Sequence, residues 1–85
     1  MAFSMMGGFW APKGMAFDSR GDLYVVDTGR HRVQKFTPDG RSLGCWGHHG
    51  RGEGQLNNPW ALVRDSQGRI HVLDTNNHRI QRIEM

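Results

Sequence analysis

Residues 12–36 read PKGMAFDSRGDLYVVDTGRHRVQKF, and residues 59–83 read PWALVRDSQGRIHVLDTNNHRIQRI. The two segments are offset by 47 residues, and ten of their 25 aligned positions are identical. Most other positions exchange similar residues, as Met15 with Leu62 and Val33 with Ile80. A repeat of this length with strand-like segments is typical of propellers and similar arrays. Since one such unit cannot bury its own apolar faces, the number of repeats determines which partners the chain needs.

Each repeat alternates strand-like runs with turn residues. Residues 23–26 are apolar and aromatic, and residues 32–36 alternate polar with apolar side chains, as in a half-exposed strand. Residues 18–21 and 37–40 carry the Asp, Pro and Gly residues of tight turns. We therefore expect strands over residues 13–18, 23–26, 32–36 and 43–47 in the first repeat, and over 60–65, 70–74 and 79–83 in the second.

The predicted fold class is all-β, with two β-propeller blades whose unit is four antiparallel strands. The second repeat has no fourth strand of its own, but residues 3–7 match residues 43–47 in pattern: apolar, small, apolar, apolar, glycine. Within a single domain of residues 1–85, we expect an outer strand in 1–8, a first blade in 9–47, a glycine-rich loop in 48–58 and a second blade without its own outer strand in 59–85.

The expected partner is the chain itself. A chain of 85 residues buries only roughly 60% of its unfolded surface, and an open sheet edge seeks a strand. If residues 1–8 complete the second blade of a neighbour, head-to-tail contacts close into a ring. Three copies make six blades, and rings of two or four copies stay open as alternatives. The expected assembly residues are Phe3, Met5, Met6, Phe9, Trp10, Trp46, Trp60, Ile80 and Ile83.

Composition and charge exclude few classes of binding partner. Eleven Lys and Arg residues against eight Asp and Glu give a net charge of +3, which favours weak attraction to polyanions without specificity. The single cysteine, Cys45, excludes an intrachain disulfide framework, and we expect it to be buried or half-buried. No stretch has the length of a membrane span, and the N-terminus has no basic segment before its apolar part. We expect no membrane partner and no signal peptide, and the compartment stays open.

A polar motif recurs in both repeats. Because a catalytic centre converges on one place, a motif present in every blade favours a structural role. We expect a turn whose Asp carboxylate accepts backbone N–H groups, with the His and Arg side chains satisfying carbonyl or acidic groups between blades. These turn residues are Asp27, His31 and Arg32, repeated as Asp74, His78 and Arg79.

These residues resemble the NHL repeat, and the resemblance covers nearly the whole chain. The segment Asn76-Asn77-His78-Arg79 is the one that gives the family its name, and its spacing to Asp74 is specific. The resemblance implies a propeller, most often six-bladed, that serves as a scaffold for protein partners. Some members bind single-stranded RNA on a basic rim, and a few relatives are lyases or metal-dependent hydrolases. The chain departs from the family at Arg64, His71 and Gly29-Arg30.

Other chemistry is weakly supported. The alternative function is an RNA- or peptide-binding module that uses the basic rim loops, and its possible RNA contacts are Arg30, Arg51 and Arg69. No histidine or cysteine pair has the spacing of a closed zinc site, although three copies of His71 around a ring axis could hold a metal. No serine lies in a G-x-S-x-G elbow. We therefore predict no enzyme activity, no cofactor and no catalytic residues.

Overall fold

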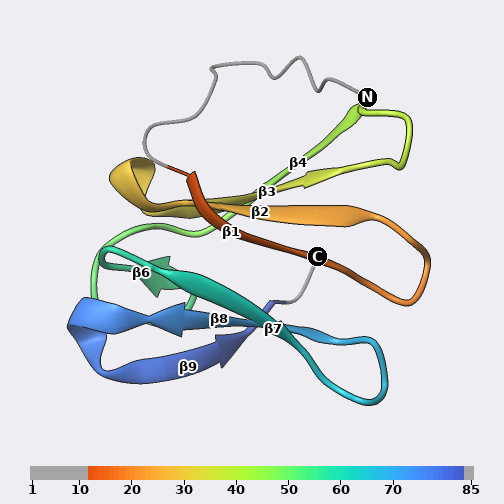
Figure 1. The fold of residues 1–85 in the computed structure, drawn as a ribbon. Coiled ribbons are helices and arrows are strands. Elements are labelled where there is room, and N and C mark those ends of the chain that lie inside the picture. Colours follow the sequence, from red (N-terminus) through yellow and green to blue (C-terminus); the bar gives the residue numbers. More distant parts are fainter. Residues whose placement is uncertain (1–11, 84–85) are drawn as a thin grey trace.

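The computed structural model describes residues 12–83, which form two small antiparallel sheets (Figure 1). The first sheet has the strand order β1-β2-β3-β4, and the second has the order β7-β8-β9. The strands are β1 Pro12–Phe17, β2 Leu23–Asp27, β3 Arg32–Phe36, β4 Ser42–Trp46, β5 His48–His49, β6 Gln55–Leu56, β7 Ala61–Arg64, β8 Ile70–Asp74 and β9 Arg79–Arg82. The expectation of an all-β fold with antiparallel sheets is confirmed.

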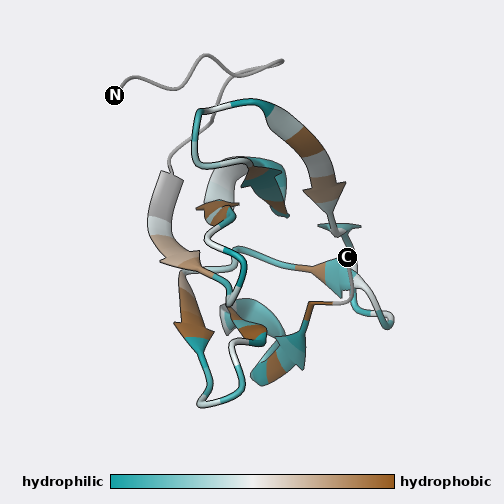
Figure 2. Ribbon diagram, turned by 90° about the vertical axis from the view of Figure 1, so that its right-hand side faces the viewer, coloured by the Kyte–Doolittle hydropathy of each residue, from teal (hydrophilic) through white to brown (hydrophobic). Residues whose placement is uncertain are grey.

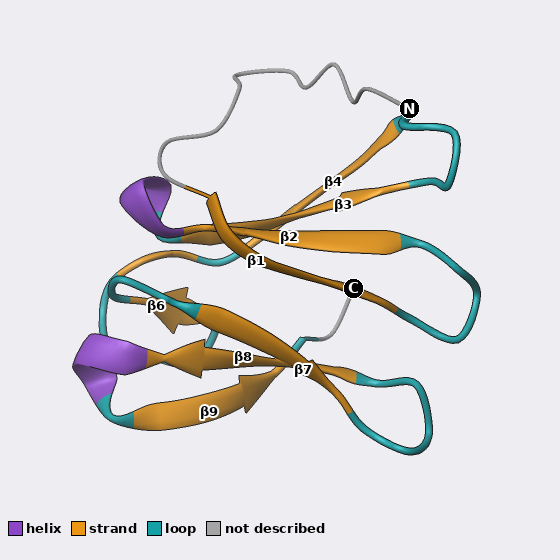
Figure 3. Cartoon of the chain, viewed as in Figure 1, coloured by secondary structure: helices purple, strands orange, loops and turns teal. Residues whose placement is uncertain are grey.

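Both sheets are built the same way, as the sequence repeat predicts. A single 3-10 turn joins the second and third strands of each sheet: η1 Thr28–Arg30 and η2 Thr75–Asn77. Figure 3 shows these two turns in purple at the same end of the molecule, with the hairpin turns at the other end. Neither turn has the length and hydrophobicity needed to cross a membrane.

Aspartate side chains shape the first hairpin of each sheet. Asp18 Oδ1 accepts the backbone N–H groups of Arg20 and Asp22 at 2.9 and 3.1 Å. In the second sheet, Asp65 Oδ1 accepts those of Gln67 and Arg69, both at 2.9 Å. These bonds hold the chain in a local turn between the strands, the arrangement for which aspartate is favoured at such positions.

The core lies between the two sheets. Alternate side chains of β2 and β8 point into this space, because successive side chains of a strand face opposite sides. In Figure 2 apolar residues form short brown stretches within the strands. A buried cluster joins the sheets, and its members are Tyr24, Val26, Val33, Leu56, Ile70, Val72 and Ile83. A second buried cluster, Leu23, Val25 and Phe36, lies on the opposite face of the first sheet.

Two expectations differ from the structure. The segment 48–58 is not irregular throughout, because β5 and β6 pair in parallel and Leu56 is fully buried in the core. Cys45 is exposed, not buried, because it lies on β4, the outermost strand of the first sheet. The expected outer strand in residues 1–8, with Phe3, Met5 and Met6, and the assembly residues Phe9 and Trp10 lie outside the described residues.

Candidate functional site: the joint between the blades

Thr28 and His31, which lie between β2 and β3, connect the first sheet to the residues that precede β7 of the second sheet. The Thr28 hydroxyl donates to the Pro59 carbonyl oxygen at 2.6 Å. The Asn58 N–H donates to His31 Nδ1 at 3.0 Å. His31 directly follows η1 in the left-handed conformation, with φ of 54°, and its own N–H bonds the Thr28 carbonyl. The turn therefore aims an imidazole and a hydroxyl at the next blade.

The bond to Asn58 fixes the protonation of His31. A backbone N–H can only donate, so Nδ1 must be unprotonated, and the neutral ring carries its proton on Nε2. Burial lowers the pKa of His31, and the neighbouring His49 lowers it further, while Asp74 acts in the opposite direction. The rings of His31 and His49 lie 4.2 Å apart between centroids. The joint thus favours an uncharged imidazole.

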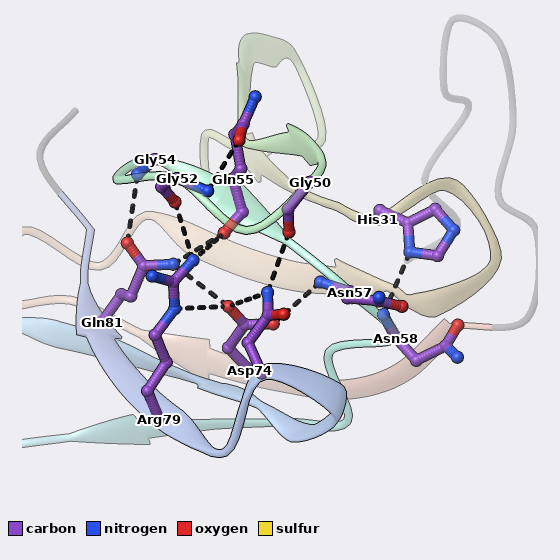
Figure 4. A network of polar contacts seen from close by, with 11 residues as sticks. His31, Gly50, Gly52, Gly54, Gln55, Asn57, Asn58, Asp74, Arg79 and Gln81 are labelled. Atoms are coloured by element: carbon purple, nitrogen blue, oxygen red, sulfur yellow. Dashed lines mark hydrogen bonds and ion pairs between the residues drawn. The ribbon is translucent and has the colours of Figure 1, made fainter.

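Asp74 is the centre of a polar network at the same end of the second sheet (Figure 4). Its Oδ1 accepts the Asn57 N–H at 2.8 Å. Its Oδ2 accepts from Asn77 Nδ2 at 2.9 Å, Arg79 Nε at 2.8 Å and Gln81 Nε2 at 3.2 Å. Burial raises the pKa of Asp74, but these hydrogen bonds outweigh it and hold the pKa below its usual value. The carboxylate is therefore ionised and fully buried.

Arg79 and Gln81 carry this network to the segment between the sheets. Arg79 Nη2 donates to the carbonyl oxygens of Gly52 and Gln55 at 2.7 and 2.9 Å. Gln81 Nε2 donates to Gln55 O at 2.7 Å, and Gln81 Oε1 accepts the Gly54 N–H at 3.1 Å. Residues 50–57 are therefore held against β9 and η2, which positions Leu56 in the core.

Of the predicted turn residues, His31, Asp74 and Arg79 make bonds at this joint. Asp74 accepts a backbone N–H group, and Arg79 donates to an acid and to carbonyl groups, which are the kinds of bond that the sequence suggested. Other bonds differ from the expectation. The carboxylates of Asp27 and Asp74 do not cap the 3-10 turns that follow them, and Asp74 bonds the distant Asn57 instead. His31 accepts a backbone N–H across the joint where we expected it to satisfy a carbonyl or an acid. Asp27 Oδ2 lies 3.5 Å from Arg32 Nε within one sheet, and His78 is exposed.

A second pair of interactions was not identified from the sequence. Tyr24 OH donates to Asp18 Oδ2 at 3.1 Å, and His71 Nε2 lies 2.9 Å from Asp65 Oδ2 at the equivalent place. The hydrogen bond from His71 lowers the pKa of Asp65 strongly. His71 thus replaces an aromatic residue and keeps its bond to the hairpin aspartate. The 47-residue alignment of Tyr24 with His71 was the signal that could have revealed this pairing.

The remaining candidates are spread over the molecule. Arg69 pairs with Asp65 at 2.7 Å beside the β7–β8 hairpin, at the opposite end of the strands from Arg30 in η1 and from Arg51, whose loop is bonded to η2. The structure therefore does not bring the three predicted RNA contacts together. Within residues 12–83, no group of three or more metal-binding side chains is present.

The predicted assembly residues divide into two groups. Ile83 is buried in the core between the sheets, and Trp46 packs against that core. Both side chains therefore stabilise the joint within the chain. Trp60 and Ile80 are 50% and 65% exposed.

Comparisons with known proteins place both repeats in one family of repeats. The family model for the NHL repeat matches residues 9–36 and 56–83, about two thirds of the chain. Protein brain tumor from Drosophila melanogaster is 38% identical over 55 residues, which are 65% of this chain and 5% of that protein. B-box type zinc finger protein ncl-1 from Caenorhabditis elegans is 46% identical over 37 residues, 44% of this chain and 4% of that protein. The chain thus matches only a small part of each relative's length.

Proposed function

This chain belongs to the NHL-repeat family, and we propose that it is a non-catalytic β-propeller scaffold for protein partners, built by self-assembly of several copies. In this proposal, residues 1–8 of one copy form the fourth strand of the second sheet of its neighbour. Three copies then give the six blades that the family resemblance implies. The propeller rims would carry the surfaces that bind other proteins.

The observation that carries the proposal is the open edge of β9. In the first sheet β3 lies between β2 and β4, whereas within residues 12–83 its counterpart β9 pairs with β8 alone. An unpaired strand edge presents N–H and C=O groups in the spacing that a further strand needs, and adding such a strand is a common mode of recognition.

The first sheet provides the register for the missing strand. Val33 lies opposite Trp46, and Lys35 lies opposite Gly44. By the 47-residue offset, Ile80 and Arg82 occupy the positions of Val33 and Lys35. The donated segment would then place Met6 opposite Ile80 and Ser4 opposite Arg82. An apolar side chain would thus cover Ile80, and a small one would leave room for Arg82.

The surface beside β9 suits such a strand. A hollow runs along it between the two sheets, lined by Trp46, Glu53, Gly54, His71, Gln81 and Arg82. The 65% exposed Ile80 lies on the same strand. A strand laid along β9 would reduce that exposure while its backbone satisfies the open edge.

Deletion of residues 1–8 tests strand donation. The full chain and the deletion variant are compared by light scattering, and the variant is then mixed with a peptide of residues 1–8. We expect the deletion to lower the mass of the assembly, and the peptide to bind and restore it. The matched control is the same peptide with Met6→Asp, which should bind more weakly. An unchanged mass after deletion would contradict strand donation.

A further inference from the structure

The described residues expose apolar side chains on the two outer faces of the stacked sheets. The first-sheet outer face carries Met15 and Phe17, which are 65% and 51% exposed. The second-sheet outer face carries Val63, Leu73 and Ile80, which are 57%, 39% and 65% exposed. Strand register places the members of each set on one side of their sheet: Val63 and Leu73 alternate with the core-facing Leu62 and Val72, and Leu73 lies opposite Ile80.

The internal repeat indicates what each outer face fits. Val63, Leu73 and Ile80 align with Ala16, Val26 and Val33, which form the first-sheet side of the joint. The second-sheet outer face is therefore a second copy of a surface that this chain already covers with another sheet.

The first-sheet outer face repeats the opposite side of the joint. Met15 aligns with Leu62, which packs against the core between the sheets. Leu23 and Val25 lie on this face and are buried in a cluster with Phe36. They align in the same way with Ile70 and Val72 of that core. The two outer faces are thus repeat copies of the two surfaces that already pack together inside one chain.

Among the described residues, the Thr75 hydroxyl lacks a hydrogen bond that its repeat equivalent makes. Thr28 Oγ1 donates to Pro59 O across the joint, but the equivalent Thr75 Oγ1 is buried and has no hydrogen-bond partner within residues 12–83. A buried hydroxyl without a partner is destabilising, because it has lost its hydrogen bonds to water. Pro59 aligns with Pro12, so the missing acceptor corresponds to the carbonyl oxygen of Pro12 in another copy.

We propose that the second-sheet outer face binds the first-sheet outer face of a second copy of this chain, head to tail, in the geometry of the joint within one chain. The inference rests on the proposed self-assembly and identifies its contact surface. Because two different faces meet, the contact is heterologous, and an open row of copies keeps one free face at each end until the ring closes. Blade stacking would continue across the boundary between copies without a change in geometry.

The hairpins provide a second contact across this boundary. Within the chain, a Cβ atom added at Gly68 would lie 2.5 Å from Ser19 Cβ, so the two hairpins touch with no room for a side chain. Gly21 and Ser66 are their repeat equivalents, and a Cβ atom at Gly21 would meet only Pro38 Cγ, at 3.8 Å. In the proposed contact, Ser66 of one copy lies against Gly21 of the partner subunit.

Mixing two variants tests both the surface and its polarity. Ile80→Asp places a charge on the second-sheet outer face, and Met15→Asp places one on the first-sheet outer face. Each variant alone should lose the oligomer, since every possible joint contains one altered face. An equimolar mixture should form a 1:1 dimer and nothing larger, because one intact face of each kind remains. Leu43→Asp, an equally apolar-to-acidic change at a 43% exposed site on β4, should keep the wild-type mass.

The outcomes separate this inference from the proposed function. A wild-type chain that is monomeric overturns self-assembly and this inference together. An oligomeric wild type whose mass neither substitution changes overturns this inference alone, as does a mixture of the two variants that forms no dimer. Circular dichroism of each variant reports folding. If either variant unfolds, Ser66→Tyr is used instead: it alters an exposed hairpin residue and should prevent assembly by clashing with Gly21 of the partner subunit.

Discussion

At the scale of single residues, the joint depends on side chains whose charge state the fold fixes. His31 must be neutral to accept the Asn58 N–H, whereas Asp74 must be ionised to accept from Asn57, Asn77 and Arg79. Acid therefore changes two groups in the joint. It protonates His31 Nδ1, which turns a hydrogen-bond acceptor into a donor, and it neutralises the Asp74 carboxylate. Both changes remove hydrogen bonds between segments distant in the sequence.

His31 should make stability depend on pH in the mildly acidic range. Its pKa is lower in the folded chain than the value of about 6.5 expected when unfolded, so the unfolded state binds more protons between these two values. The free energy of unfolding should therefore be highest above about pH 6.5 and should fall as pH decreases through the folded pKa. Urea titrations at several pH values measure this.

His31→Asn should remove this dependence, and His78→Asn provides the matched control. Both histidines have φ of 54°, a conformation that asparagine tolerates, but His78 is exposed. The control should keep the wild-type pH profile. Equal profiles for His31→Asn and the wild type would show that the Asn58 bond does not control the joint.

Asp74→Asn should destabilise the chain by roughly 2–4 kcal/mol, because the amide leaves the Arg79 guanidinium without its carboxylate and places a donor among donors. Asp39→Asn, in an exposed turn where, of the described side chains, the carboxylate bonds only the neighbouring Thr37 hydroxyl, should destabilise the chain much less than Asp74→Asn. Chemical denaturation of both variants at neutral pH compares them. Similar losses at the two sites would contradict the structural importance of the Asp74 network.

At the scale of elements, the repeat produces the same glycine-containing hairpin in both sheets. Of the two hairpin glycines, only Gly68, in the second hairpin, lies against a described residue of the other sheet. Gly21 and Gly68 have φ values of 85° and 78°, so both favour glycine for the same backbone reason. They differ in surroundings, because Gly68 contacts Ser19 of the other sheet and Gly21 faces open space apart from Pro38. Comparing substitutions at Gly21 and Gly68 therefore separates the stability cost of backbone strain from that of the contact between blades.

Gly68→Ala should therefore cost more stability than Gly21→Ala. The Gly21 variant pays about 1 kcal/mol for the left-handed conformation, and the Gly68 variant adds an overlap that costs typically 1–3 kcal/mol. Thermal unfolding monitored by circular dichroism gives both values. Ser19→Gly in the Gly68→Ala background should recover part of the difference. If the two alanine variants lose the same stability, the hairpins do not pack as described.

The strands of both sheets could be predicted, whereas the bonds between them could not. Residues 32–36 and 70–74 carry apolar patterns and flanking turn residues, which are local signals. The pairing of β5 with β6 spans two residues in each strand and depends on Gln55 contacting His48 and Gly52. No local pattern marks such a short ladder, so the segment reads as a loop.

The same limit applies to the joint. The repeated Asp, His and Arg residues predict a structural motif, because their presence at identical positions in both copies favours a structural role over a single catalytic centre. The partners of Asp74 include Asn57, which lies 17 residues away and reaches the carboxylate only after the two sheets stack. Exposure at Cys45 likewise depends on β4 being the outermost strand, which composition does not indicate.

At the scale of the whole molecule, Leu56 holds the two sheets together. It is fully buried in the cluster that joins the two sheets, on the segment that Arg79 bonds through the Gln55 carbonyl. Leu56→Ala should cost about 2–5 kcal/mol through the lost contacts and the cavity left behind. The exposed Leu43→Ala should cost less than about 1 kcal/mol. If urea denaturation gives the same loss of stability for Leu56→Ala and Leu43→Ala, Leu56 does not hold the sheets together.

Within residues 12–83, the two stacked sheets leave an outer face on each side and an open edge on β9, and in the proposed assembly all three surfaces bind further copies of the same chain. Sedimentation equilibrium of the unmodified chain across micromolar concentrations tests this claim most directly. A closed ring of three copies predicts a mass three times that of one chain, constant above the assembly concentration. The mass of a single chain throughout that range would contradict it.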